Sequence, residues 1–400
     1  MADEMYIDDI EIPYESEEDQ LKHDKNIDKF YLQKRVMVEK VRKFNITDRD
    51  LMVLSEIYYG QMIPVWLIAE MHFKGTEAYK KKRLAALRRH GLIGTSIYVT
   101  VDGDGKKTRG GLHYMTNSGI NTVETIQGSR ERLTRVRIPE YTASDKKKYL
   151  QIAELRFTAF QYEKEWLYGK QVRESVYIKH NLQIEAQVDN LCIFVLKERP
   201  SRRGLIHLKT SISKLAGVEH TDHLVVCDPA DRVGIMQFLS MHSDDDLLGP
   251  VVNGKQDLWI LTQDESVQHL RKRFEGVRPH DNLVNNMREH GLETVAVEND
   301  EGITPYVIRH GNEKYYLADF TDYNILELIR VMDYRSELFK RYDGPDGVLM
   351  QVKDIGQLKE IATLLRTTVE AQGHIKYMLA EPHNGSNMFS IEDGCIMARR

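Results

Sequence analysis

The run Asp102-Gly103-Asp104-Gly105 restricts the fold of the N-terminal third more than any other feature of the sequence. It stands between two segments rich in β-forming residues. Asp-Gly steps favour the tight turns of two-stranded hairpins, because glycine accepts the positive φ that such turns require. We therefore expect a hairpin whose strands are residues 93–101 and 112–115.

Three helices are expected before this hairpin. Residues 47–60 begin with Thr47 as N-cap and carry acids in the first turn, where the helix dipole favours them. Residues 64–73 begin with Pro64, and residues 77–90 stop before Gly91, a residue type that commonly follows a helix. A further short helix opens at residues 116–119. Three helices and a hairpin are the element order of a winged helix-turn-helix, which we expect over residues 45–128.

Charge is distributed unevenly along the chain. The formal net charge is −5, which by itself argues against a polyanionic partner. Residues 1–20 carry nine acids and no base, whereas residues 45–150 carry 18 Lys and Arg against 11 Asp and Glu. An acidic, disordered arm over residues 1–25 is therefore expected ahead of a basic module. The arm is interpreted as a solubility tail. Its apolar residues, such as Ile7 and Tyr14, leave open that it docks on the basic surface in place of DNA.

The third helix carries much of the positive charge. Residues 74–93 contain seven bases, and Glu77 is the single acid. Leu84 and Leu87 lie one turn apart and can pack inward, so that the bases spread over the other side of the helix. Like charges on one face repel each other unless a polyanion compensates them. Duplex DNA is such a polyanion.

We therefore predict that the third helix and the hairpin bind double-stranded DNA. The third helix of a winged helix enters the major groove with its N-terminal residues closest to the base edges. Bases near the hairpin tip suit phosphate or minor-groove contacts. The predicted DNA-binding residues are Thr76, Tyr79, Lys80, Lys81, Lys82, Arg83, Arg88, Arg89, Lys106, Lys107 and Arg109. The alternatives are a solvated structural helix and a winged helix that binds protein.

Five groups of residues between positions 46 and 124 follow a family pattern. They are Ile46-Thr47-Asp48-Arg49-Asp50, Ile63-Pro64-Val65-Trp66-Leu67, Arg83-Leu84 with Leu87, Gly91-Leu92-Ile93, and Tyr114-Met115-Thr116 with Gly119. With these segments, residues 46–124 resemble the N-terminal winged helix of the replication-relaxation family. The resemblance implies a protein of plasmids and other mobile elements, with a role in plasmid replication or in DNA relaxation during transfer. A theta-type plasmid replication initiator is also similar in size and layout.

The rest of the chain follows a different pattern after a basic linker at residues 129–148. A helix is expected over residues 149–168, and apolar strands that alternate with helices then indicate an α/β region. The expected strands are 175–178, 191–196, 205–209, 224–227, 258–261, 294–297, 306–309, 315–318 and 348–352. The expected helices are 211–217, 230–241, 264–274, 321–341 and 354–371. The overall fold class is α+β. Residues 149–280 and 281–380 show a similar alternation of strands and helices, which indicates a degenerate repeat or one continuous mixed sheet. Residues 381–400 are expected to be a flexible tail.

The resemblance further implies a restriction-endonuclease-like fold for the C-terminal region, with a Pro-Asp on one strand and an acid pair on the next. Here Val188-Asp189 stands at the place of the Pro-Asp, and the next expected strand, Ile206-His207-Leu208-Lys209, has no acid. A metal-dependent nuclease needs two or three converging acids, and Glu174 or Glu185 would have to supply the others. Asp189 is therefore interpreted as a strand-end or turn residue.

Other catalytic patterns fail on inspection. The sequence has no Walker A run, which argues against a P-loop ATPase. A tyrosine relaxase needs a histidine cluster for its metal, and His220 with His223 lacks a third member nearby, so these residues are interpreted as a polar loop. The acids Asp244-Asp245-Asp246 are interpreted as a solvated loop. Three scattered cysteines favour neither a disulfide framework nor a zinc site.

We therefore expect a cytoplasmic DNA-binding protein of a mobile element that is not an enzyme and needs no cofactor or metal. Its partner is double-stranded DNA, with no role for a membrane. Candidate protein partners are a second copy of the chain and replication or transfer proteins. The rival hypotheses are a winged-helix transcription regulator, a metal-dependent nuclease or relaxase accessory enzyme, and a structural adaptor.

Overall fold

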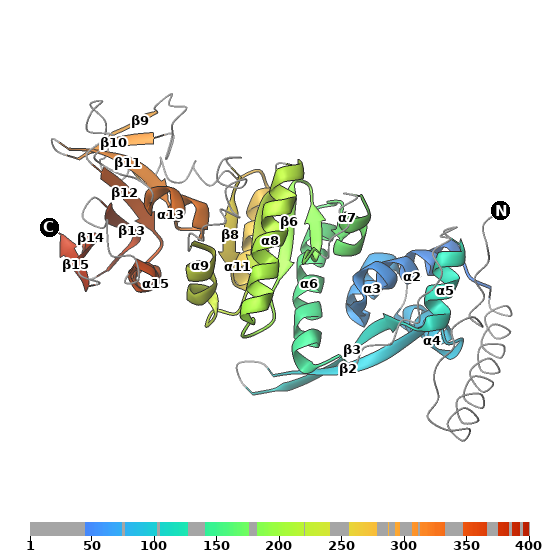
Figure 1. Cartoon of the computed structure of the whole chain (residues 1–400). Helices are drawn as coiled ribbons and strands as arrows, with labels where there is room; N and C mark the ends of the chain where they lie inside the picture. The colour runs from blue at the N-terminus through green and yellow to red at the C-terminus, as the bar shows by residue number, and fades with distance from the viewer. Residues whose placement is uncertain are drawn as a thin grey trace, which may run out of the picture. The chain divides into compact units, whose positions relative to one another are not determined.

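The computed structural model describes 15 separate stretches of the chain (Figure 1). These are residues 45–73, 77–101, 105–126, 141–175, 182–219, 221–240, 256–277, 287, 293–296, 306–310, 313–332, 347–365, 375–383, 386–392 and 395–399. The chain divides into two compact units, Met1–Glu140 (unit 1) and Tyr141–Arg400 (unit 2). The acidic arm, Thr76, His220, residues 244–246 and residues 129–140 of the expected linker lie outside the described residues.

The described residues of unit 1 form four helices and a small antiparallel sheet. Its elements are α2 (Asp48–Gly60), β1 (Met62–Pro64), α3 (Val65–His72), α4 (Glu77–Arg89), β2 (Ile93–Val101), β3 (Lys107–Met115) and α5 (Asn117–Ile126). The strand order is β1-β3-β2, and every pairing is antiparallel. The predicted helices and the first hairpin strand are confirmed. The return strand starts at Lys107, earlier than the predicted residue 112. Strand β1 was not predicted, because three residues are too few to show the alternation of a strand.

The helix ends in unit 1 follow the sequence signals. Thr47 and Asp50 form a capping box at the start of α2, because each side chain accepts a hydrogen bond from the other's backbone N–H. Gly91, the second residue after the end of α4, has a φ of +72°, in the region that glycine tolerates best. The core includes Leu54, Ile57 and Leu87, none of which is exposed to solvent. These segments therefore fold by local capping and by burial of one apolar face.

The first sheet of unit 2 has the order β4-β5-β6-β7-β8. Its elements are α6 (Ala143–Gln161), β4 (Leu167–Tyr168), α7 (Gly169–Ser175), β5 (Ala186–Val188), β6 (Leu191–Val195), α8 (Arg202–Glu219), β7 (Asp222–Val226), α9 (Arg232–Ser240), β8 (Leu258–Leu261) and α11 (Gln263–Phe274). Helices α6 and α11 pack on each other and against β6 and β7, while α8 packs on α9. The strands β6, β7 and β8 are almost entirely buried, as their continuous apolar sequences predict.

The second sheet of unit 2 has the order β15-β14-β13-β12-β11-β10-β9. Its elements are β9 (Glu293–Ala296), β10 (Tyr306–His310), β11 (Glu313–Asp319), α13 (Ile325–Met332), β12 (Gly347–Val352), α15 (Ile355–Leu365), β13 (Ile375–His383), β14 (Ser386–Glu392) and β15 (Cys395–Arg399). Helix α13 contacts β8 of the first sheet as well as β11 of its own. The two sheets therefore share a buried boundary within unit 2.

The two sheets of unit 2 repeat one pairing pattern. In the first sheet, β4–β5 and β5–β6 are antiparallel, whereas β6–β7 and β7–β8 are parallel. In the second, β9–β10 and β10–β11 are antiparallel, whereas β11–β12 and β12–β13 are parallel. The two sheets are separate and share one pairing order, which differs from the predicted alternative of one continuous mixed sheet. Strands β14 and β15 extend only the second copy.

One predicted strand is a helix. Residues 205–209 belong to α8, which spans Arg202–Glu219. Leu205, Leu208, Ile212 and Leu215 are buried at helical spacing, whereas Ile206 is 46% exposed. Ser201 caps the start of α8 by accepting a hydrogen bond from the N–H of Gly204 at 3.2 Å. Five apolar-rich residues fit the period of a strand as well as that of a helix. The helical period becomes clear only over the longer segment that α8 covers.

Several predicted boundaries are also wrong. Helix α6 starts at Ala143 behind a Thr142 capping box, so Lys146-Lys147-Lys148 lie in the helix and not in the linker. It ends at Gln161 rather than 168. Ser175 ends α7 instead of opening a strand. The expected flexible tail contains β14 and β15, because these strands complete the edge of the second sheet.

The described elements make the chain a mixed protein of helices and several sheets, in agreement with the predicted α+β class. None of the helices in the described stretches has the length and apolar character needed to cross a membrane.

Candidate nucleic-acid interface

Helix α4 carries a basic face opposite its buried face. Leu84 and Leu87 are 3% and 0% exposed and fix the inward side. Lys81, Lys82, Arg88 and Arg89 are exposed on the outward side. Residues seven apart differ by about 20° around a helix, so Lys81 lies in line with Arg88 and Lys82 with Arg89. These four predicted DNA-binding residues therefore form two adjacent rows, about 100° apart around the helix, which together we call the basic stripe.

Small residues accompany this basic stripe. Ala78 and Ala85 lie four and three residues from neighbouring bases, hence on the same face. Alanine side chains allow a helix to approach another surface closely. Arg88 and Arg89 lie in the last turn, where cations also interact favourably with the helix dipole. The helix dipole thus accounts for part of the positive charge at Arg88 and Arg89, whereas Lys81 and Lys82 lie outside the last turn.

Two other predicted residues of α4 lie at the side of the stripe. The ammonium of Lys80 is 3.8 Å from the Glu70 carboxylate of α3, and its side chain is 14% exposed. The ring of Tyr79 is 46% exposed and packs edge-on against Phe73 at a centroid distance of 6.3 Å. Lys80 is therefore partly neutralised, while Tyr79 presents an aromatic ring beside the bases.

Arg83 serves a structural purpose and leaves the predicted DNA-binding set. Its Nε donates to Asp50 Oδ1 at 2.7 Å, its Nη2 forms an ion pair with the same carboxylate, and Nη2 also donates to the carbonyl oxygen of Asn45 at 3.0 Å. Burial raises the pKa of Asp50, but the hydrogen bonds from Arg83 and Thr47 outweigh that effect and lower it. The guanidinium is thus committed to a buried carboxylate.

The β2–β3 hairpin adds a second group of bases. Lys106, Lys107 and Arg109 are exposed, and the hairpin register pairs Arg109 with Val99 and Lys107 with Val101. Residues directly opposite each other share one face of a sheet. Ile97 and Val99, on this same face, are 48% and 57% exposed. The hairpin therefore presents apolar side chains next to basic ones.

Asp189 does not lie in an acidic cluster of the described residues. It occupies the turn between β5 and β6 with a φ of 50°, and its carboxylate is 3.1 Å from the Lys164 ammonium. The prediction of a turn residue is confirmed. The next strand is β6, Leu191–Val195, and not residues 206–209; it too contains no acid. Over the described stretches, no group of three or more His, Cys, Asp and Glu residues could hold a metal ion.

The predicted polar loop at residues 220–223 is partly a strand. Asp222 and His223 belong to β7, and His223 is fully buried. The His223 ring lies within 3.3 Å of Gln256 Oε1, and burial lowers its pKa to about 4. Its role in the described structure is packing inside the first sheet.

The comparisons with known proteins give little guidance. No family model matches the chain, and no curated protein matches it. One solved structure that matches is that of the restriction endonuclease FokI bound to DNA, with 9% sequence identity, 61% of this chain covered and a TM-score of 0.23. The match spans about half of the endonuclease, 48% of its chain. A likeness of this degree supports no statement about fold or function.

Sequence reasoning missed two features. The Asp50–Arg83 ion pair joins residues that lie 33 positions apart, and no local pattern indicates it. A pocket in unit 2 combines residues from β8, α11, β11 and β12. The polar residues Asp319 and Gln351 were a sequence signal for this pocket, because each interrupts the apolar residues of its strand near the end.

Proposed function

We propose that unit 1 is a winged helix that binds double-stranded DNA in the cytoplasm, with α4 in the major groove and the β2–β3 hairpin as the wing. The observation that carries the proposal is the exposure of bases on both elements, α4 and the hairpin. Both would meet phosphates in a winged-helix complex. The element order and the β1-β3-β2 sheet support it, since three helices precede the hairpin.

The revised DNA-binding set omits Arg83. Lys81, Lys82, Arg88 and Arg89 would contact phosphates and base edges from α4, with Thr76, Tyr79 and Lys80 near its N-terminal end. Lys106, Lys107 and Arg109 would contact phosphates from the wing, where the exposed Ile97 and Val99 could touch the sugar edges of the minor groove.

We further propose that the chain serves a mobile genetic element, in plasmid replication initiation or relaxation, as a non-enzymatic DNA-binding protein. The support is the resemblance of residues 46–124 to the replication-relaxation family together with the basic surface. A winged-helix transcription regulator would use the same contacts. Mapping the bound DNA across the host genome separates these roles, because repeats at an origin, a transfer origin and a promoter are different sites.

DNA binding is tested by reversing two charges of the α4 stripe. We expect Lys81→Glu with Arg88→Glu to weaken duplex binding by about 100-fold or more at low salt, because each lost phosphate contact removes counterion release. The slope of log affinity against log salt should become shallower by about two. Fluorescence anisotropy with a labelled duplex measures both quantities.

The matched control is Arg203→Glu with Lys359→Glu. Both residues are exposed in unit 2, on α8 and α15, and the change in net charge is the same. This control should keep the duplex affinity of the wild type to within a few-fold. Equal losses in the two double variants would mean that only overall charge matters, and the proposal would then fail.

A further inference from the structure

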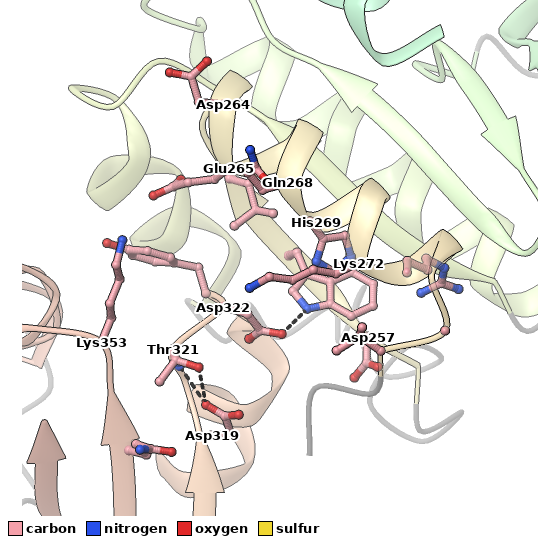
Figure 2. A pocket seen from close by; sticks show the side chains of 17 residues that line it. Asp257, Asp264, Glu265, Gln268, His269, Lys272, Asp319, Thr321, Asp322 and Lys353 are labelled. Atoms are coloured by element: carbon pink, nitrogen blue, oxygen red, sulfur yellow. Dashed lines mark hydrogen bonds between the residues drawn. The ribbon is translucent and has the colours of Figure 1, made fainter. Parts of the chain in front are cut away.

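Unit 2 contains a pocket of about 930 Å³ that neither the sequence motifs nor the proposed DNA-binding surface uses. Strand β8 and helix α11 form one wall, and the residues that end β11 and β12 form the other (Figure 2). The volume lies in the range of small-molecule sites, roughly 300–1,000 Å³. Ligands of α/β sheets commonly bind at the carboxyl ends of parallel strands, and β11 and β12 are parallel there.

Two polar residues interrupt the apolar pattern at this edge of the sheet. Asp319 and Gln351 are direct partners in the β11–β12 register, as are Leu317 and Leu349 two residues earlier. Strand residues two apart point to the same face, so Asp319 and Gln351 continue the face on which Leu317 and Leu349 pack in the core. Asp319 is 6% exposed and Gln351 1% exposed. Burial of two polar side chains at apolar positions needs a reason other than packing.

The amide nitrogen of Gln351, a residue that lines the pocket, lacks a hydrogen-bond partner. This Nε2 is buried and donates no hydrogen bond to any residue in the described part of the chain. Nε2 of His269, on the α11 wall, is also buried and has no hydrogen-bond partner among the described residues. A buried donor without an acceptor destabilises a fold. An acceptor on a bound ligand would satisfy the Gln351 amide.

Carboxylates stand next to this amide. Thr321 donates to Asp319 through its N–H at 3.0 Å and its hydroxyl at 2.6 Å. Asp322 accepts hydrogen bonds from the Trp259 indole at 2.8 Å and from the Asn324 N–H at 3.2 Å. Burial, with repulsion from Asp319, raises the pKa of Asp322 to about 7. The raised pKa favours the uncharged, protonated form of Asp322, so Asp319 is the carboxylate placed to accept hydrogen bonds from neutral donors.

Two lysines approach from opposite walls. Lys272 extends from α11, and Lys353 follows the end of β12 (Figure 2). Both are exposed. Two further charged residues of the lining are paired inside the protein, Arg273 with Asp222 at 2.8 Å and Glu265 with Arg232 at 2.9 Å. The lining also contains the carboxyl groups of Asp257, Asp264, Asp319 and Asp322. The lysines are therefore the cations that an anionic group of a ligand would meet.

These groups together specify an amphoteric ligand of substantial size. It must present an acceptor to Gln351, donors to Asp319 and an anionic group to the lysines. An amino acid has these groups, but it would leave most of the volume empty. A nucleotide fits better, because the edge of every base places donors and acceptors side by side and the phosphate supplies the charge.

We propose that this pocket binds a nucleotide, with Asp319 and Gln351 bonded to the base edge and Lys272 and Lys353 bonded to the phosphate. The nucleotide could come from two sources, a free mononucleotide or a residue of single-stranded DNA. The inference stands independently of DNA binding by unit 1, since the residues found to line the pocket belong to unit 2.

The test is calorimetric titration of the full chain with each of the four deoxynucleoside monophosphates and the corresponding nucleosides. We expect saturable binding of at least one monophosphate. Gln351→Leu should weaken it by about 10-fold or more, while the melting temperature of the unliganded protein stays the same or rises, because the unpaired amide is removed. A merely structural Gln351 would instead lower the melting temperature.

Lys353→Gln provides a second, exposed variant. It should weaken the monophosphate by about 10-fold and leave the nucleoside affinity unchanged, whereas Lys359→Gln, an exposed lysine on α15 outside the pocket, should change neither. A short single-stranded oligonucleotide, tested in the Lys81→Glu, Arg88→Glu background, identifies the source: tighter binding than the free nucleotide indicates DNA. The proposal is overturned if neither probe binds at millimolar concentration, or if binding is insensitive to both pocket variants.

Discussion

The Asp50 carboxylate joins three segments of unit 1 at the scale of single residues. It caps α2 through Thr47, binds the Arg83 guanidinium of α4, and is itself fully buried. Arg83 in turn donates to the carbonyl of Asn45. The pair therefore fixes where α4 lies relative to α2, and with it the orientation of the basic stripe.

Removal of the cation from this pair should destabilise unit 1. We predict that Arg83→Met lowers the free energy of unfolding by about 3 kcal/mol, because it leaves the buried Asp50 carboxylate without its counter-charge. Urea denaturation followed by circular dichroism measures the change. The neighbouring Arg49 is exposed, and Arg49→Met should stay within about 0.5 kcal/mol of the wild type. Comparable effects of the two substitutions would show that the pair does not hold the helices together.

At the scale of elements, two glycines in helices differ in whether the neighbouring backbone leaves room for a Cβ atom. Gly169 begins α7 beside β4, and a Cβ there would lie 1.9 Å from the carbonyl oxygen of Ile184. Gly234 lies within α9, and a Cβ there would meet no heavy atom within 4 Å. Close backbone approach thus requires glycine at the first position only.

Alanine substitutions in unit 2 should separate these two roles. Gly169→Ala should destabilise the protein by roughly 2 kcal/mol or more, since backbone must move to admit the methyl group. Gly234→Ala should stabilise it by up to about 1 kcal/mol, because alanine has the higher helix propensity. Differential scanning calorimetry of both variants provides the comparison. A neutral Gly169→Ala would mean that α7 is free to shift away from residue 184.

The fate of residues 205–209 shows which elements could be predicted. Helices with clear end signals and an apolar pattern of helical spacing over many residues, such as α2 and α4, can be predicted from local sequence. The segment 205–209 looks like a strand only because five apolar-rich residues fit either period, and Ser201 supplies the deciding cap. Short strands such as β1 depend on their partners, here β3, and no local signal specifies them.

Acid stability is a property of the whole molecule, because buried histidines occur in both units. Burial lowers the pKa of His113 in unit 1 to about 4, and that of His223 and His269 in unit 2 also to about 4. The ordinary value is 6.5. Between pH 6.5 and 4 the unfolded chain therefore binds protons that the folded protein does not. The contribution to stability is complete above pH 6.5 and is lost as the pH falls toward 4.

We predict a loss of up to about 3 kcal/mol for each fully buried histidine over this range. Urea denaturation at a series of pH values measures it. His223→Gln, which retains an N–H donor for Gln256, should flatten the pH dependence of unit 2. His207→Gln, at an exposed position on α8, should leave it unchanged. An identical pH dependence in wild type and His223→Gln would contradict the assignment.

The repeated pairing pattern of unit 2 also belongs to this scale. The second copy places its parallel strands β11 and β12 so that their ends meet β8 and α11 of the first copy. A backbone bridge between Trp259 and Asn324 joins the two copies at this point. The pocket thus depends on both sheets, because neither sheet alone supplies both walls.

Much of the candidate interface was predictable, whereas the pocket was not. The bases of α4 and the hairpin follow from charge counting and helical spacing, which depend on neighbours in the chain. Arg83 has the same residue type as Arg88, but only its position beside the buried Asp50 separates their roles. Asp319 and Gln351 were visible as interruptions of apolar strands, yet their pairing depends on the β11–β12 register.

The sequence by itself determined the α+β class, the capped helices and the uneven charge of the chain. Capping, periodicity and electrostatic repulsion act over a few residues, so local sequence is sufficient for them. Only the tertiary structure decided which bases are exposed, that residues 205–209 are helical in α8, and that two sheets enclose a pocket. Burial and strand register depend on contacts between distant segments, which composition and spacing do not encode in any readable local form.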